Sequence, residues 1–65
     1  MNREYDIFEK FSDGSVLWRD FVRGLEPARA RLEELASSSK NEFFAMHTPT
    51  KDIAVRVNIA EDMLR

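Results

Sequence analysis

Residues 5–22, YDIFEKFSDGSVLWRDFV, carry the pattern from which the fold of this chain is predicted. Two segments rich in aromatic and β-branched residues, 4–11 and 16–22, flank the tetrapeptide Ser12-Asp13-Gly14-Ser15. Asp-Gly supplies the positive backbone angles of tight turns, so the stretch predicts a β-hairpin centred on residues 13 and 14. A two-residue turn at this point predicts the pairs Phe11 with Val16, Glu9 with Trp18 and Ile7 with Asp20.

This register assigns the side chains of the hairpin to two faces. The face expected to meet the core carries Tyr5, Ile7, Phe11, Val16, Trp18 and Val22. The opposite face carries Asp6, Phe8, Lys10, Leu17, Arg19 and Phe21. Trp18 is thus expected in the core, whereas a register slip by one residue would move it outward beside Phe8 and make it an interface residue.

The hydrophobic period changes after Gly24 and predicts a helix. Apolar side chains recur at helical spacing, at Leu25, Ala28, Leu32, Leu35 and Ala36. Pro27 fits the first helical turn, where its missing N–H costs nothing, and the poor helix formers of residues 37–41 end the helix in a loop.

The segments 42–47 and 52–58 predict a second hairpin around the turn at residues 48–51, where Pro49 presets the backbone. Alternation predicts that the face toward the helix carries Phe44, Met46, Ile53, Val55 and Val57. The opposite face then carries Phe43, Ala45, His47, Asp52, Ala54 and Arg56.

The order strand, strand, helix, strand, strand predicts an α+β fold, a two-layer ββαββ domain with one helix on one face of a four-stranded antiparallel sheet. We expect the strand order 2-1-3-4, which makes every neighbour antiparallel; strand 2 beside strand 3, or a hairpin swapped between chains, are the alternatives. Residues 1–65 are expected to form a single small domain, ordered over about 4–58, with a frayed tail over 59–65.

Composition excludes several classes of protein. The chain has 65 residues, 34% of them charged, a net charge of -2 and no cysteine, which removes disulfide frameworks, cysteine zinc sites and thiol catalysis. No segment reaches the roughly 20 apolar residues of a membrane span, and acidic residues near the start are unlike a signal peptide, so we expect a cytoplasmic protein. The interspersed charges give no field that would draw the whole chain onto nucleic acid or anionic lipid.

No motif predicts catalysis, a metal or a cofactor. His47, the only histidine, could neighbour Asp52 across its turn, but such a pair is typical of a surface hydrogen bond. The adjacent carboxylates Glu33 and Glu34 splay apart on a helix face beside arginines, and the two glycines form no phosphate loop. The sequence therefore favours a non-enzymatic protein without cofactors.

The expected outer face of the sheet is the feature that points to a function, because aromatic and basic side chains gather there. The candidate interaction surface comprises Phe8, Leu17, Arg19, Phe21, Phe43, His47 and Arg56. We expect it to bind protein, first of all a second copy of this chain, which would supply the hydrophobic core that so short a chain lacks. The alternative is a platform for single-stranded nucleic acid that also uses Lys10, which the carboxylates of Asp6, Glu9, Asp20 and Asp52 disfavour.

Four segments of the chain are Asp13-Gly14-Ser15-Val16-Leu17-Trp18-Arg19, Gly24-Leu25-Glu26, Leu32-Glu33-Glu34-Leu35-Ala36 and Asn41-Glu42-Phe43-Phe44-Ala45-Met46-His47. Together they resemble a group of short bacterial proteins that have no assigned activity. The resemblance covers about residues 4–58 and implies a stand-alone small protein. It transfers no functional residue.

Overall fold

A computed structural model describes residues 3–58 of the chain, and the expected tail over 59–65 lies outside them. The elements follow in the order β1 (Glu4–Lys10), β2 (Val16–Arg23), α1 (Leu25–Ala36), β3 (Glu42–His47) and β4 (Asp52–Val57). The four strands form an antiparallel sheet in the order β2-β1-β3-β4. The predicted ββαββ fold and strand order are confirmed.

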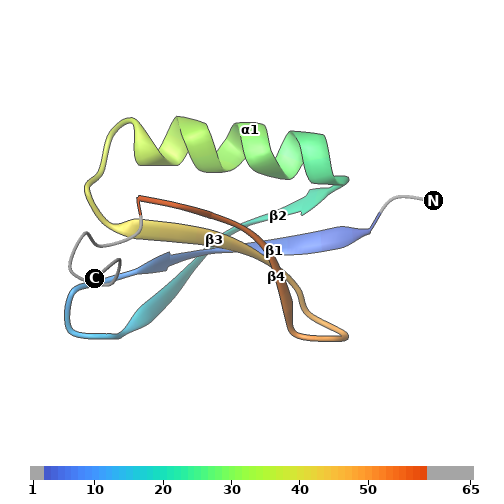
Figure 1. Ribbon diagram of the computed structural model, residues 1–65, viewed down its shortest axis with the longest axis horizontal. Coiled ribbons are helices and arrows are strands. Elements are labelled where there is room, and N and C mark those ends of the chain that lie inside the picture. The colour runs from blue at the N-terminus through green and yellow to red at the C-terminus, as the bar shows by residue number, and fades with distance from the viewer. Residues whose placement is uncertain (1–2, 59–65) are drawn as a thin grey trace.

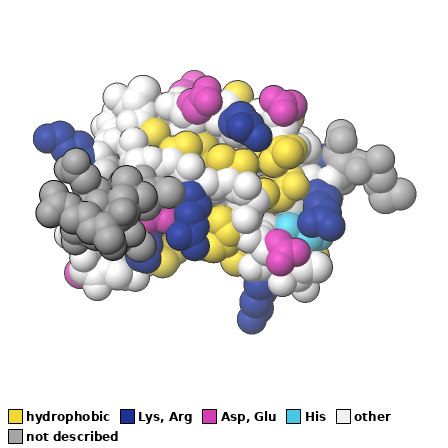
Figure 2. All heavy atoms as spheres, viewed as in Figure 1, with side chains coloured by type: hydrophobic (Ala, Val, Ile, Leu, Met, Phe, Trp, Pro, Cys, Tyr) yellow, Lys and Arg dark blue, Asp and Glu magenta, His cyan; other side chains and the backbone are white. Residues whose placement is uncertain are grey.

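Helix α1 covers one face of the sheet, which we call the inner face (Figure 1). The core between the two layers consists of Tyr5, Ile7, Ala28, Leu32, Leu35, Phe43 and Ala45, with Val22, Ala36, Val55 and Val57 packed around it. Figure 2 shows hydrophobic side chains in the band between the layers and charged side chains along the outward surface of the helix. The other face of the sheet, which we call the outer face, has no element of residues 3–58 packed on it.

The helix is held at both ends by contacts that the sequence makes possible. Gly24 adopts φ 99°, where a glycine is favoured, and its carbonyl accepts the first helical hydrogen bond from Ala28 at 3.1 Å. At the other end, Asn58 Nδ2 donates to the carbonyls of Ala36 at 3.3 Å, Ser39 at 2.9 Å and Asn41 at 3.3 Å. The end of β4 thereby closes the loop that joins α1 to β3.

The first hairpin departs from the predicted register. Its loop is longer than two residues, because Phe11 N–H donates to the Ser15 carbonyl at 2.9 Å and Val16 lies opposite Lys10. A β-bulge then leaves Arg19 without a partner on β1. Ile7 faces Asp20 as predicted, but the pairs of Phe11 with Val16 and of Glu9 with Trp18 are wrong.

The loop and the bulge change which face the residues of β2 occupy, because side chains alternate along a strand. Trp18 lies opposite Phe8 on the outer face and is 54% exposed, so its predicted place in the core is wrong. Val16, also predicted for the core face, is exposed opposite Lys10. Leu17, predicted for the outer face, lies opposite Glu9 on the inner face.

The side chains of strand β3 lie on the opposite faces of the sheet from those predicted. Phe43 and Ala45 are buried in the core, whereas Phe44 and Met46, which were expected to meet the helix, lie on the outer face. A second bulge places Met46 opposite Ile53 and leaves Ala54 unpaired, so Ile53 also lies outside. Because the bulge reverses the alternation once, Val55 and Val57 still contact the core as predicted.

Candidate interaction face

The outer face is built from two cross-strand rows of side chains. In the order β2, β1, β3, β4, the first row is Phe21, Asp6, Met46 and Ile53, and the second row is Trp18, Phe8, Phe44 and Arg56. Val16, Lys10 and Glu42 continue the face toward the first hairpin loop. These rows bring together aromatic side chains from three separate strands.

The aromatic side chains of the second row are ordered by contacts within the sheet. The rings of Phe8 and Phe44 stack with their centroids 5.3 Å apart and their planes 24° from parallel. Trp18 Nε1 donates to Asp6 Oδ1 at 3.1 Å, which orients the indole over the neighbouring strand. Such fixed rings lose little conformational freedom when a partner covers them.

The carboxylate of Asp6 lies in the middle of the face with both oxygens occupied. One accepts the hydrogen bond from Trp18, and the other accepts one from the Thr48 hydroxyl. At the β4 side, Arg56 Nε lies 3.9 Å from a carboxylate oxygen of the buried Glu42, and the Arg56 side chain remains 44% exposed. The polar groups of the face are thus either paired within the chain or placed at its margin.

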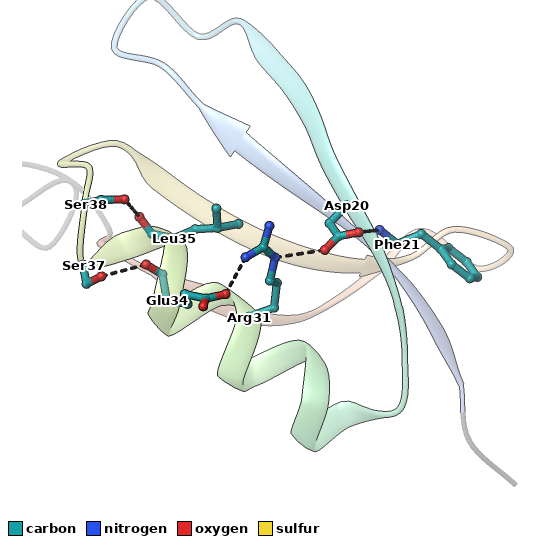
Figure 3. Close-up of polar contacts among 7 residues, drawn as sticks. All are labelled: Asp20, Phe21, Arg31, Glu34, Leu35, Ser37 and Ser38. Carbon is teal, nitrogen blue, oxygen red and sulfur yellow. Dashed lines mark hydrogen bonds and ion pairs between the residues drawn. The ribbon is translucent and has the colours of Figure 1, made fainter.

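Phe21 projects from the outer face directly beside a polar contact of the inner face (Figure 3). Its sequence neighbour Asp20 points toward the helix, where it accepts from Arg31 Nε at 2.9 Å. Arg31 also donates to Glu34, and the hydrogen bonds to Glu34 and then Asp20 raise the pKa of Arg31. This contact ties β2 to α1 and leaves Phe21, 49% exposed, on the uncovered side.

Three of the seven residues predicted for the interaction surface lie on the outer face: Phe8, Phe21 and Arg56. Phe43 is 1% exposed in the core, because β3 presents it to the helix, so its predicted place on this face is wrong. Leu17, Arg19 and His47 lie on the inner side of the sheet, which corrects their predicted face as well.

The inner-side residues have partners of their own. Arg19 Nη1 lies 3.3 Å from Glu9 Oε1, and the buried Glu9 carboxylate also accepts a hydrogen bond from Asn41 Nδ2 at 2.6 Å. The His47 ring packs edge-on against Tyr5, and its Nδ1 lies 3.0 Å from the Glu4 carbonyl, to which it can donate. These contacts account for Arg19 and His47 as parts of the folded structure.

Sequence reasoning missed Trp18, Phe44, Met46 and Ile53 as members of the outer face. The available signal was the one-residue slip that would place Trp18 beside Phe8, since the bulge at Arg19 produces this neighbour. For Phe44 and Met46 the alternation pattern held no signal, because both faces of β3 are apolar.

Other kinds of site find little support in residues 3–58. Their His, Asp and Glu side chains form no group of three that could hold a metal ion. Their only helix is twelve residues long and charged on its outward surface, too short and too polar to cross a membrane. Searches of protein-family models, curated proteins and solved structures found nothing that matches the chain.

Proposed function

We propose that this chain is a small non-enzymatic protein-interaction module that homodimerises through the outer face of its sheet. The observation that carries the proposal is the ordered row of Trp18, Phe8 and Phe44 on a face that no described element covers. Aromatic side chains dominate the energetics of protein interfaces, and exposed apolar patches typically mark contact sites.

The size of the core supports self-association. Among residues 3–58, the large side chains that are completely buried are only Phe43, Ile7 and Leu32. A chain of this length buries about 60% of the surface that its unfolded form exposes, so its stability is marginal. A second copy on the outer face would add apolar burial without any change in the fold, and the lack of cysteine fits the cytoplasmic location that we include in the proposal.

Binding of single-stranded nucleic acid on the same face is the weaker alternative. The exposed Trp18 and the stacked phenylalanines could support bases. However, the described part of the face holds Asp6 at its centre and Glu42 near its margin, and its basic groups are Lys10, Arg56 and Arg23, the last in an ion pair with Glu4 at 2.9 Å. Phosphate binding draws on several basic side chains, so the charges of the face favour protein.

The direct test measures molecular mass in solution by light scattering over a wide dilution series. We expect twice the chain mass of 7.6 kDa for the parent and the single-chain mass for Phe21→Asp, because a carboxylate would then be buried without a partner. The matched control is Leu17→Asp, which changes a side chain of similar exposure on the same strand but on the inner side.

Three results would contradict the proposal: a parent that is monomeric at every concentration, a Phe21→Asp variant that keeps the parent mass, or a control that dissociates equally. A monomer that binds an oligonucleotide, with affinity falling steeply as salt increases, would favour the nucleic-acid alternative.

A further inference from the structure

The side chains of the outer face differ between the two edges of the sheet. At the β2 edge it carries the apolar side chains of Phe21 and Trp18, both about half exposed. At the β4 edge it carries Ile53 and the guanidinium of Arg56. The two central strands contribute the stacked pair Phe8 and Phe44. A surface that differs between its edges constrains how two identical copies can cover each other.

We propose that two copies stack outer face to outer face about a two-fold axis that runs parallel to the strands. This inference rests on the proposed homodimer and specifies its geometry. The axis places β2 of one copy over β4 of the other and β1 over β3, an aligned sheet packing of the kind found in β-sandwiches. The facing residues are Trp18 with the partner's Arg56, Phe8 with the partner's Phe44, and Phe21 with the partner's Ile53.

The pair of Trp18 and Arg56 is the chemical reason for this arrangement. The indole Nε1 donates a hydrogen bond to Asp6, which holds the ring in place while Trp18 stays 54% exposed. Arg56 forms a long ion pair with Glu42, at 3.9 Å, and its exposed guanidinium can lie over an aromatic face. Cation–π contacts strengthen when they are desolvated, and the two-fold axis forms this contact twice.

The carboxylate of Asp6 can be buried in such an interface without leaving either of its oxygens without a hydrogen bond. Both of its oxygens already accept hydrogen bonds, from Trp18 and Thr48 of the same chain. Burial of a charged carboxylate is costly, and the two hydrogen bonds, which are retained on stacking, reduce this cost.

Other symmetric pairings fit the face less well. A two-fold axis across the strands stacks β4 on β4 and brings both Arg56 guanidinium groups to the same edge of a desolvated interface, where like charges repel. Pairing through the strand edges is disfavoured because both edge strands carry a bulge, with Arg19 unpaired in β2 and Ala54 in β4. Bulges twist an edge away from further strand pairing.

Cysteine cross-linking tests the pairing, since the chain has no cysteine of its own. Phe21→Cys and Ile53→Cys are prepared separately, confirmed as folded dimers by circular dichroism and mass, and treated with a short bis-maleimide linker either alone or after mixing. Trp18→Cys and Arg56→Cys form a second pair. It tests the same geometry independently, in case a substitution in the first pair disturbs the structure around it.

We expect covalent dimers mainly in the two mixtures. Each variant alone should link poorly, because identical residues then lie at opposite edges of the stacked sheets, three strand spacings or about 14 Å apart laterally. Stronger linking of Phe21→Cys alone than of the mixture would overturn the proposal in favour of the axis across the strands. If the protein is a dimer but no combination of variants links, the proposed stacking geometry is wrong and the proposed homodimer still holds. If the parent is monomeric, both the stacking geometry and the homodimer are wrong.

Discussion

At the scale of single residues, Asp13 shows how one side chain organises the first hairpin. Its Oδ1 accepts hydrogen bonds from Ser15 N at 2.9 Å and from Ser15 Oγ at 2.6 Å, while Gly14 adopts φ 91°. The hydrogen bond from the Ser15 side chain, and then that from its backbone N–H, lower the pKa of Asp13 below its usual 3.8. The ionised form therefore stabilises the fold.

This shift predicts a pH-dependent contribution to stability. Because the folded-state pKa is lowered, the contribution is present above about pH 3.8 and is lost as the pH falls through the lower folded value. We expect Asp13→Asn to lower the free energy of unfolding at pH 6 and to have less effect at pH 2. Urea unfolding of the parent and of Asp13→Asn between pH 2 and pH 6 measures this effect. A difference in the free energy of unfolding that stays constant with pH would exclude a role for the charge of Asp13.

At the scale of elements, the existence of each strand and the helix followed from the sequence, but the face that β2 and β3 present did not. Gly24, Pro27 and the apolar spacing of α1 specify the helix locally. In β3, Phe43 and Ala45 alternate with Phe44 and Met46, so hydrophobicity is equal on the two sides and only packing decides. Ala45 is completely buried in the core, and the alternation of apolar and polar residues does not predict this packing.

The bulges were the second obstacle to prediction. One extra residue, Arg19 in β2 or Ala54 in β4, reverses the alternation for the rest of the strand. Arg19 carries an ion pair to the buried Glu9, a long-range contact that becomes visible only in the folded chain. The sequence therefore placed Phe8, Phe21 and Arg56 on the face where the structure has them, and placed the other residues predicted for that face wrongly.

The orientation of β3 predicts opposite outcomes for two adjacent phenylalanines. Phe43→Ala should lower the free energy of unfolding by about 3–5 kcal/mol, because it leaves a cavity in the core. Phe44→Ala should lower it by about 1 kcal/mol, mainly through loss of the stack on Phe8. Urea unfolding in the Phe21→Asp background separates these effects from dimerisation, and equal losses would contradict the assigned face.

At the scale of the whole molecule, folding and dimerisation should be coupled, because the outer face supplies apolar burial that the thin core lacks. For a folded dimer that unfolds to two separate chains, each tenfold dilution lowers the apparent free energy of unfolding by roughly 1.4 kcal/mol. With a urea dependence typical of small domains, the midpoint should fall by about 0.5–1 M per tenfold dilution. Phe21→Asp should unfold at one midpoint at every concentration, and Leu17→Asp should follow the parent, since its side chain lies on the inner side of β2. A parent midpoint that is independent of concentration, in a protein that scatters light as a dimer, would mean that each chain is stable by itself and that the outer face contributes association without contributing to folding.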